Sequence, residues 1–156
     1  MFNRSSAIIL TRLKLSRPVS GLSYFYNVSG HVGWVPGNEN NPDDEQLVQF
    51  LLREILMRGG GMAPGSWDFP DLSGKMDAVT GFWIFVQQRG ERGRLTIDGV
   101  VSPARGGATY GTKEWTIVSL NSDYKTLYRE DALAKIPSNP QLRISLRQAL
   151  QKTLQT

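Results

Sequence analysis

Residues 41–61 read NPDDEQLVQFLLREILMRGGG and predict the best-defined helix of the chain, over 42–58. Asn41 suits the N-cap, and Pro42 suits the first turn, where a missing N–H costs no hydrogen bond. The three acids that follow, and Arg58 in the last turn, match the helix dipole. Apolar residues recur in a stripe so wide that we expect burial on more than one side. The glycine run ends the helix.

Three further helices are predicted downstream. One covers 77–88, with Asp77 as its N-cap and Trp83 on an apolar face that is expected in the core. Gly81 inside it costs about 1 kcal/mol relative to alanine, so a close neighbour must require a small residue there. Another covers 113–127, where apolar residues recur at helical spacing over a length that outweighs the strand character of 115–118.

The fourth helix follows Pro140 and is predicted from an apolar stripe that runs from Leu142 to Leu154. The N-terminal part is expected to be extended. Alternation over 22–28 predicts a half-buried strand, and the apolar knot within 1–17 suits a strand or a docking arm. Residues 94–101 suit a strand or a turn.

Composition limits the functions that the chain can perform. Its 156 residues fit one domain, and no apolar run is long enough for a membrane-spanning helix. The absence of cysteine excludes disulfides, thiolate metal sites and a cysteine nucleophile, and a single histidine excludes a multi-histidine metal site within one chain. We therefore expect no metal and no cofactor.

The net charge of +4 is unevenly distributed. Residues 18–140 carry 11 bases and 14 acids, so the excess positive charge lies at the two ends. These basic ends are either solvated or form a patch for an acidic partner. The apolar run Ala7–Leu10 is too short for a secretory signal. We expect synthesis in the cytoplasm, with delivery to the envelope or incorporation into a particle by another route.

Sites of catalysis are not apparent. His31 lacks an accompanying nucleophile or orienting group and is expected to be structural or exposed. The acids Asp68, Asp71 and Asp77 suit caps and solvated charges better than a glycosidase pair. The run Gly59–Gly61 lacks the Gly-Lys-Ser/Thr of a phosphate loop, and no nucleic-acid-binding motif is present. The prediction is that the chain is not an enzyme.

Two segments share a local pattern. Leu72–Met76 is centred on Gly74 and precedes the second helix, with Thr80 following. Leu95–Pro103 is centred on Asp98-Gly99. A helix with the pattern QLVQFLL lies before the first segment. In such turns glycine adopts a backbone conformation that a Cβ opposes.

This order, over roughly 42–106, resembles the peptidoglycan-binding-like domain family. That family has a V-x-x-L-Q-x-L-L helix, a V-D-G-x-x-G-P-x-T turn, a helix ending near F-Q, and a second D-G-x-x-G-P turn. The matching residues are Gly74, Thr80, Gln87, Asp98, Gly99 and Pro103. The departures are Ser73 for Asp, Asp77-Ala78 for Gly-Pro, Ser102 for Gly, Arg105 at the Thr position, and a longer loop over 58–71.

The resemblance implies a mainly α-helical single domain with a three-helix core over 42–111. An extended N-terminal segment, 1–41, and a C-terminal helical extension, 112–156, would add to it. The implied function is non-catalytic binding of an envelope polymer such as peptidoglycan, without a membrane span. The ligand would lie in a shallow groove near loops 59–71 and 98–111. The residues expected to bind it are Trp67, Asp71, Asp98, Arg105 and Tyr110.

A different class of function stays open. The chain is alternatively an adaptor or structural subunit of a phage particle or protein-injection machine, and it uses the same fold to bind protein, with the basic ends as docking arms. The departures in both turns and the additional C-terminal residues favour this alternative. An oligomer would be compatible with it.

Overall fold

The computed structural model describes residues 11–19, 21–34, 41–59, 69–129 and 131–155. Helices are its main regular structure: α1 (Pro42–Gly59), α2 (Ala78–Gly90), α3 (Thr116–Tyr128), α4 (Ala132–Lys135), the short 3-10 helix η1 (Ile136–Ser138) and α5 (Ile144–Gln151). The strands are β1 (Thr11–Val19), β2 (Leu22–Asn27), β3 (Val32–Gly33), β4 (Val100–Val101), β5 (Thr109–Tyr110), β6 (Lys113–Glu114) and β7 (Thr153–Gln155). The predicted mainly α-helical class is confirmed.

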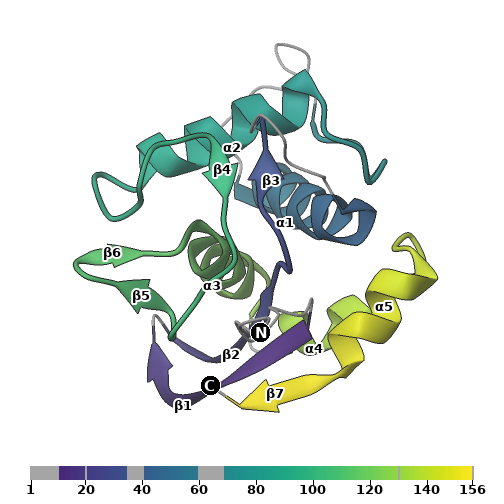
Figure 1. The fold of residues 1–156 in the computed structure, drawn as a ribbon. Helices are drawn as coiled ribbons and strands as arrows, with labels where there is room; N and C mark the ends of the chain where they lie inside the picture. The colour runs from purple at the N-terminus through teal and green to yellow at the C-terminus, as the bar shows by residue number, and fades with distance from the viewer. Residues whose placement is uncertain (1–10, 20, 35–40, 60–68, 130, 156) are drawn as a thin grey trace, which may run out of the picture.

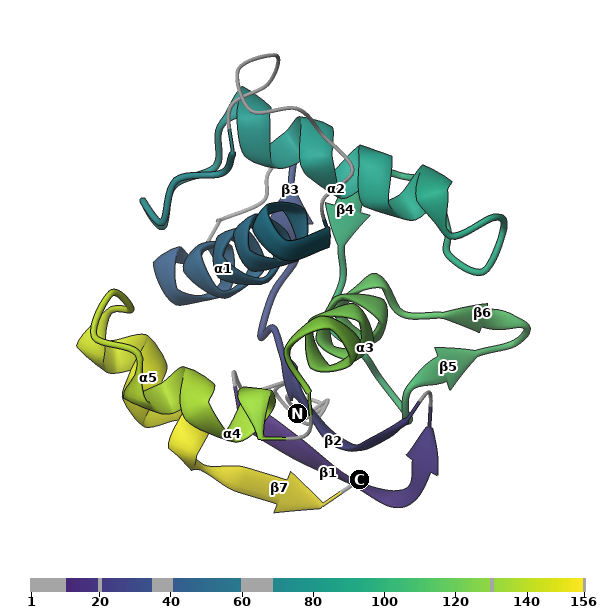
Figure 2. The ribbon, with the colours of Figure 1, turned by 180° about the vertical axis from the view of Figure 1, so that it is seen from behind.

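The helices and one small sheet enclose a common core (Figure 1). Helices α1 and α3 lie at the centre, α2 covers one side, and the sheet lies on the opposite side with α4 and α5 beside it, as Figure 2 shows from behind. The sheet has the order β2-β1-β7, with β1 antiparallel to β2 and parallel to β7. One cluster of buried apolar side chains includes residues from β2, α1, α2, α3 and α5.

Local capping explains where α1 and α2 begin. Asn41 Oδ1 accepts a hydrogen bond from Asp43 N at 2.9 Å, and Asp77 Oδ1 accepts one from Thr80 N at 2.7 Å. Trp83 is 2% exposed, as predicted for the core. A Cβ on Gly81 would lie 2.6 Å from Trp34 Nε1, which explains the glycine inside α2. The predicted N-caps and the required small residue are confirmed.

Two predicted helix boundaries are wrong because residues at those positions pair as strands, one in a local hairpin and one with a distant segment. Residues 113–114 form β6 of a hairpin with β5, so the third helix begins at Thr116. The fourth helix does not continue to Leu154, because α5 ends at Gln151 and Leu154 pairs with Leu13 of β1. Residues 94–101, for which a strand or a turn is predicted, contain both: bends and loop over 94–99, and the strand Val100–Val101 paired with β3.

A buried glutamine joins α1 to the turn before α2. Gln49 Nε2 donates to Lys75 O at 2.8 Å and to Thr80 Oγ1 at 3.2 Å, and Gln49 Oε1 accepts from Gly74 N at 2.9 Å. Gly74 has φ +71° and a Cβ there would lie 3.0 Å from Pro42 O. The side-chain amide therefore satisfies the backbone of a turn that has no strand partner.

The same arrangement recurs one helix later. Gln88 of α2 donates from Nε2 to Val100 O and to Thr116 Oγ1, both at 3.0 Å, and its Oε1 accepts from Gly99 N at 2.8 Å. Asp98 Oδ1 accepts from the same Nε2 at 3.1 Å and from Val100 N at 3.0 Å. Each unit thus consists of a helix glutamine, a turn glycine with positive φ, and a threonine in the first turn of the next helix.

This internal repeat corrects two residue assignments. Gln88, and not Gln87, is the glutamine that holds the second turn, because Gln87 is part-buried and donates to Glu91 and Asp123 instead. Thr116, and not Arg105, occupies the threonine position, because Thr116 Oγ1 accepts from Gln88 as Thr80 Oγ1 accepts from Gln49. The chain between the second turn and its threonine contains the β5–β6 hairpin, which the first unit lacks.

Replacing Gln88 by alanine should destabilise the fold by about 2–4 kcal/mol, since it leaves several buried backbone groups without partners. Gln87→Ala is the matched control and should cost less than Gln88→Ala, because Gln87 is only part-buried and pairs with no backbone group in the described hydrogen bonds. Urea unfolding monitored by tryptophan fluorescence measures both values. Equal losses for the two variants would contradict the role given to Gln88.

Candidate functional site

A shallow pocket lies between the second glycine turn and the β5–β6 hairpin. Its volume is about 240 Å³. We call it the hairpin pocket, and its lining residues are Thr96, Asp98, Val100, Ser102, Tyr110, Trp115 and Thr116. It therefore brings together two of the predicted binding residues, Asp98 and Tyr110, with Trp115 at the start of α3.

Two aromatic rings form one wall of the hairpin pocket. The ring centroids of Tyr110 and Trp115 are 4.1 Å apart, with an angle of 41° between the planes. The β5–β6 turn reverses the chain at Gly111, where φ is +57°, and this reversal places Tyr110 beside Trp115. The Tyr110 hydroxyl shares a short hydrogen bond with Thr96 Oγ1, which fixes the ring from its far end.

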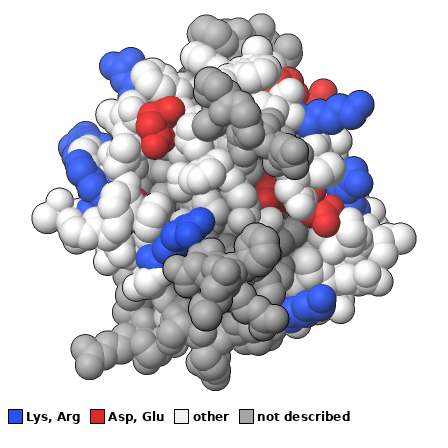
Figure 3. Space-filling view, viewed as in Figure 1, with Lys and Arg blue, Asp and Glu red and all other residues white. Residues whose placement is uncertain are grey.

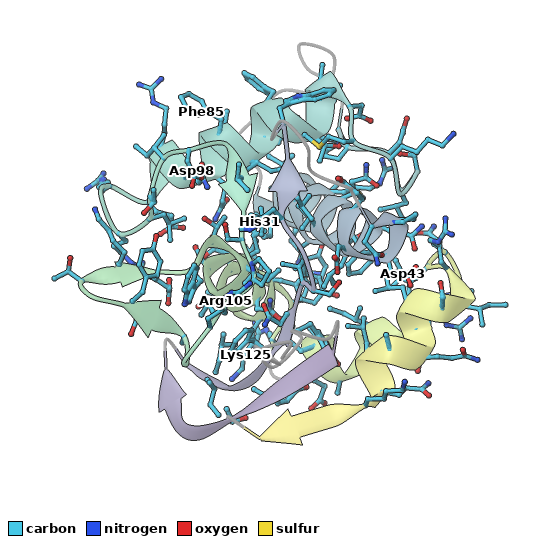
Figure 4. The ribbon with its side chains drawn as sticks, in the orientation of Figure 1. His31, Asp43, Phe85, Asp98, Arg105 and Lys125 are labelled. Carbon is cyan, nitrogen blue, oxygen red and sulfur yellow. The ribbon has the colours of Figure 1, made fainter. Side chains whose placement is uncertain are left out.

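Polar groups form the rest of the pocket. Asp98 Oδ1 is held by Gln88 and by Val100 N, whereas Asp98 Oδ2 accepts no hydrogen bond from any residue that the structure describes. Ser102 Oγ lies 3.0 Å from His31 Nδ1. The site thus offers aromatic faces, a positioned carboxylate oxygen and hydroxyl groups, all of which are groups that can bind a polar ligand. Figure 4 labels His31 and Asp98 within this part of the fold.

The other predicted binding residues lie elsewhere. Asp71 is exposed and lines a separate hollow of about 430 Å³ with Arg53 and Phe69. Asp71 lines this hollow with Asp77 and Val79 at the start of α2, whereas Asp98 is held by Gln88 near the end of that helix. Arg105 is exposed and is not among the hairpin-pocket residues. Trp67 lies outside the described residues.

Thr96, Ser102 and Thr116 were not singled out by the sequence. No local sequence pattern identifies them as site residues, because their proximity depends on the hairpin and on the contact between the second turn and α3. Trp115 stands in a segment with strand character, and its aromatic ring was the only signal.

The face shown in Figure 3 carries Lys and Arg side chains that are spread apart, with Asp and Glu between them, so on that face the charge is mixed.

Trp115 Nε1 is buried and has no hydrogen-bond partner among the described residues. Trp115→Phe should therefore leave the free energy of unfolding unchanged or raise it by up to about 1 kcal/mol, since the variant removes an unsatisfied donor and retains a ring. Trp115→Ala should lower it by about 3 kcal/mol through the lost contacts. Thermal and urea unfolding compare the variants, and a large loss in Trp115→Phe would show that the indole N–H has an essential partner.

A second unsatisfied group lies in the first turn of α1. Glu45 is 0% exposed, and neither carboxylate oxygen has a hydrogen-bond partner within the described ranges. Burial, together with the nearby charges of Asp44 and Asp77, raises the pKa of Glu45 from 4.5 to about 7. Burial also raises the pKa of Asp44, although Ser29 and Gly30 donate hydrogen bonds to it. The sequence predicts only that Glu45 suits the helix dipole, and its burial is a finding of the structure.

The raised pKa of Glu45 predicts a pH-dependent stability. Between pH 4.5 and about 7 the folded chain binds more protons than the unfolded chain, so this carboxyl lowers the free energy of unfolding as the pH rises. Glu45→Gln should be more stable than wild type at pH 8 by about 1–3 kcal/mol, with no difference near pH 4. Unfolding curves across this range test it, with exposed Asp71→Asn as the control. A constant difference at all pH values would contradict the assignment.

The described residues contain no group of three or more His, Asp or Glu that could hold a metal ion. Among the same residues, no helix has the length and apolar character needed to cross a bilayer. No family model, no curated protein and no solved structure matches the chain.

Proposed function

We propose that the chain is a non-catalytic module that binds a glycan polymer of the cell envelope, such as peptidoglycan. The observation that carries the proposal is the hairpin pocket, in which Tyr110 and Trp115 stand beside the unoccupied acceptor Asp98 Oδ2. The C–H face of a sugar ring would pack on the aromatic wall, and a sugar hydroxyl would donate to Asp98. Such binding requires no cofactor.

The size of the hairpin pocket favours a polymer over a small free ligand. Pockets that enclose small molecules have volumes of roughly 300–1,000 Å³. At about 240 Å³ the hairpin pocket is smaller and open, so it suits one unit of an extended chain. Binding through one unit is weak, and repeated units on the polymer would raise the overall avidity.

The internal repeat supports the resemblance to the peptidoglycan-binding-like family. Helix glutamine, turn glycine and helix-start threonine occur twice in the order that the family pattern has, as Gln49–Gly74–Thr80 and Gln88–Gly99–Thr116. The assignment of Thr116 removes the departure at Arg105, and Gln88 takes the place of Gln87 in the match. The hairpin that carries Tyr110 is an addition to this pattern, and so is the C-terminal extension.

Sedimentation with purified insoluble sacculi tests the proposal. The wild-type chain should co-pellet, and Tyr110→Ala should lower the bound fraction at least several-fold, because it removes half of the aromatic wall. Trp34→Ala is the matched control, since Trp34 is 65% exposed and lies against Gly81, outside the hairpin pocket. Absence of co-pelleting in the wild type, or equal loss in both variants, would contradict glycan binding.

An adaptor role is the second candidate, and the outer face of α2 favours it. Phe82, Phe85 and Val86 share that face and are 38%, 41% and 37% exposed. The Arg89 guanidinium lies 5.7 Å from the centre of the Phe85 ring. An exposed apolar helix face of this kind is typical of protein–protein contacts.

If the chain is an adaptor, α2 should mediate a defined assembly. Size-exclusion chromatography with light scattering should then give an oligomer that Phe85→Asp dissociates, because a buried unpaired charge opposes association. Arg92→Asp changes charge outside this face and should leave the assembly intact. A wild-type monomer that co-pellets with sacculi would argue against the adaptor role.

A further inference from the structure

A second hollow lies at the C-terminal end of α3, whereas the hairpin pocket lies at the N-terminal end of that helix. Its volume is about 880 Å³, and it lies between the C-terminal half of α3, α4 and the β1–β2 turn. We call it the α3–α4 cavity. Its lining residues are Gly21, Ser122, Lys125, Thr126, Tyr128, Arg129, Asp131, Ala132 and Lys135.

Basic side chains outnumber acidic ones in the described lining of the α3–α4 cavity. Its described charged residues are Lys125, Arg129, Lys135 and Asp131. Lys125 Nζ donates to Gly21 O, which ties this cation to the β1–β2 turn, and Figure 4 shows its position below α3. The side chains of Arg129 and Lys135 have no ion-pair partner in the described part of the chain.

The backbone of Arg129 is strained. It follows α3 with φ 72° and ψ −175°, a region that is essentially restricted to glycine. Ten described residues have positive φ, and all are glycine except Arg92 and Arg129. Glycine is also the usual residue after a helix C-terminus. The dipole of α3 favours a cation near this end, but Lys125 already supplies one. The dipole therefore does not explain why arginine stands where glycine would cost less.

We propose that the α3–α4 cavity binds a small polyanion with at least two phosphate or carboxylate groups, and that Arg129 is its main ligand. The planar guanidinium binds either group through two parallel hydrogen bonds. Lys125 and Lys135 add positive charge at two further points, which suits an anion with more than one charged group. The volume fits a ligand larger than a single inorganic ion. This site is independent of the hairpin pocket and of the proposed glycan binding.

Calorimetric titration of the full chain with tripolyphosphate and, separately, citrate tests this proposal and distinguishes phosphate from carboxylate. Wild type should bind at least one probe at millimolar concentration or below, more weakly at high salt. Arg129→Gly should weaken that binding at least tenfold. The same variant should raise the melting temperature by about 2–4 °C, because it relieves the backbone strain.

Arg92→Gly is the matched control, since it removes the same charge and the other non-glycine positive φ but lies outside the cavity lining. It should leave the affinity unchanged. The proposal is overturned if wild type binds neither probe, if both glycine variants weaken binding equally, or if Arg129→Gly lowers the melting temperature. If Arg129→Gly loses binding while its melting temperature rises, then Arg129 binds the ligand and is not needed for the stability of the fold.

Discussion

Buried side-chain amides hold this fold together. Apart from the β2-β1-β7 sheet, the described strands are only two residues long, so much of the buried backbone has no strand partner. An amide side chain offers one donor group and one acceptor, as a peptide group does, and it can pair with such backbone. Asn121 of α3 donates to Tyr26 O and accepts from Tyr26 N, and Asn27 pairs with Ala104 in the same way. The remaining amides of this kind are Gln46, Gln49 and Gln88.

The two glutamine-centred units explain how a repeated scaffold carries a unique site. In the first unit the chain runs from Gly74 directly to Thr80 at the start of α2. In the second, the interval from Gly99 to Thr116 is longer and contains the β5–β6 hairpin. The glutamine contacts are nevertheless the same, so the additional residues extend outward without disturbing the core. The hairpin pocket is lined in part by these additional residues, which the first unit lacks.

What the sequence could predict follows from the range of each interaction. Helices α1 and α2 depend on caps and apolar spacing within a few residues, and both were predicted. Leu154 continues a helical apolar stripe, so the local pattern predicts a helix there. Its strand partner Leu13 lies near the other end of the chain, and the local pattern contains no sign of that pairing. The hairpin pocket depends on contacts among three separate segments. Its aromatic and acidic members were recognisable by type, but their proximity was not.

Helix α3 departs from ordinary capping at both ends, and each end borders a cavity. Its N-cap is Trp115, which makes no side-chain capping bond, and its C-cap is Arg129 in a glycine conformation. A chain that pairs so many buried backbone groups with amide side chains could also place polar side chains as caps at the ends of its helices. Asn41 and Asp77 do so at α1 and α2, whereas α4 and α5 also begin without a side-chain capping bond, so the glycine conformation of Arg129 is the departure that distinguishes α3. Departures from local rules that the fold does not need concentrate at functional sites. On this ground we place both proposed binding sites at the ends of α3.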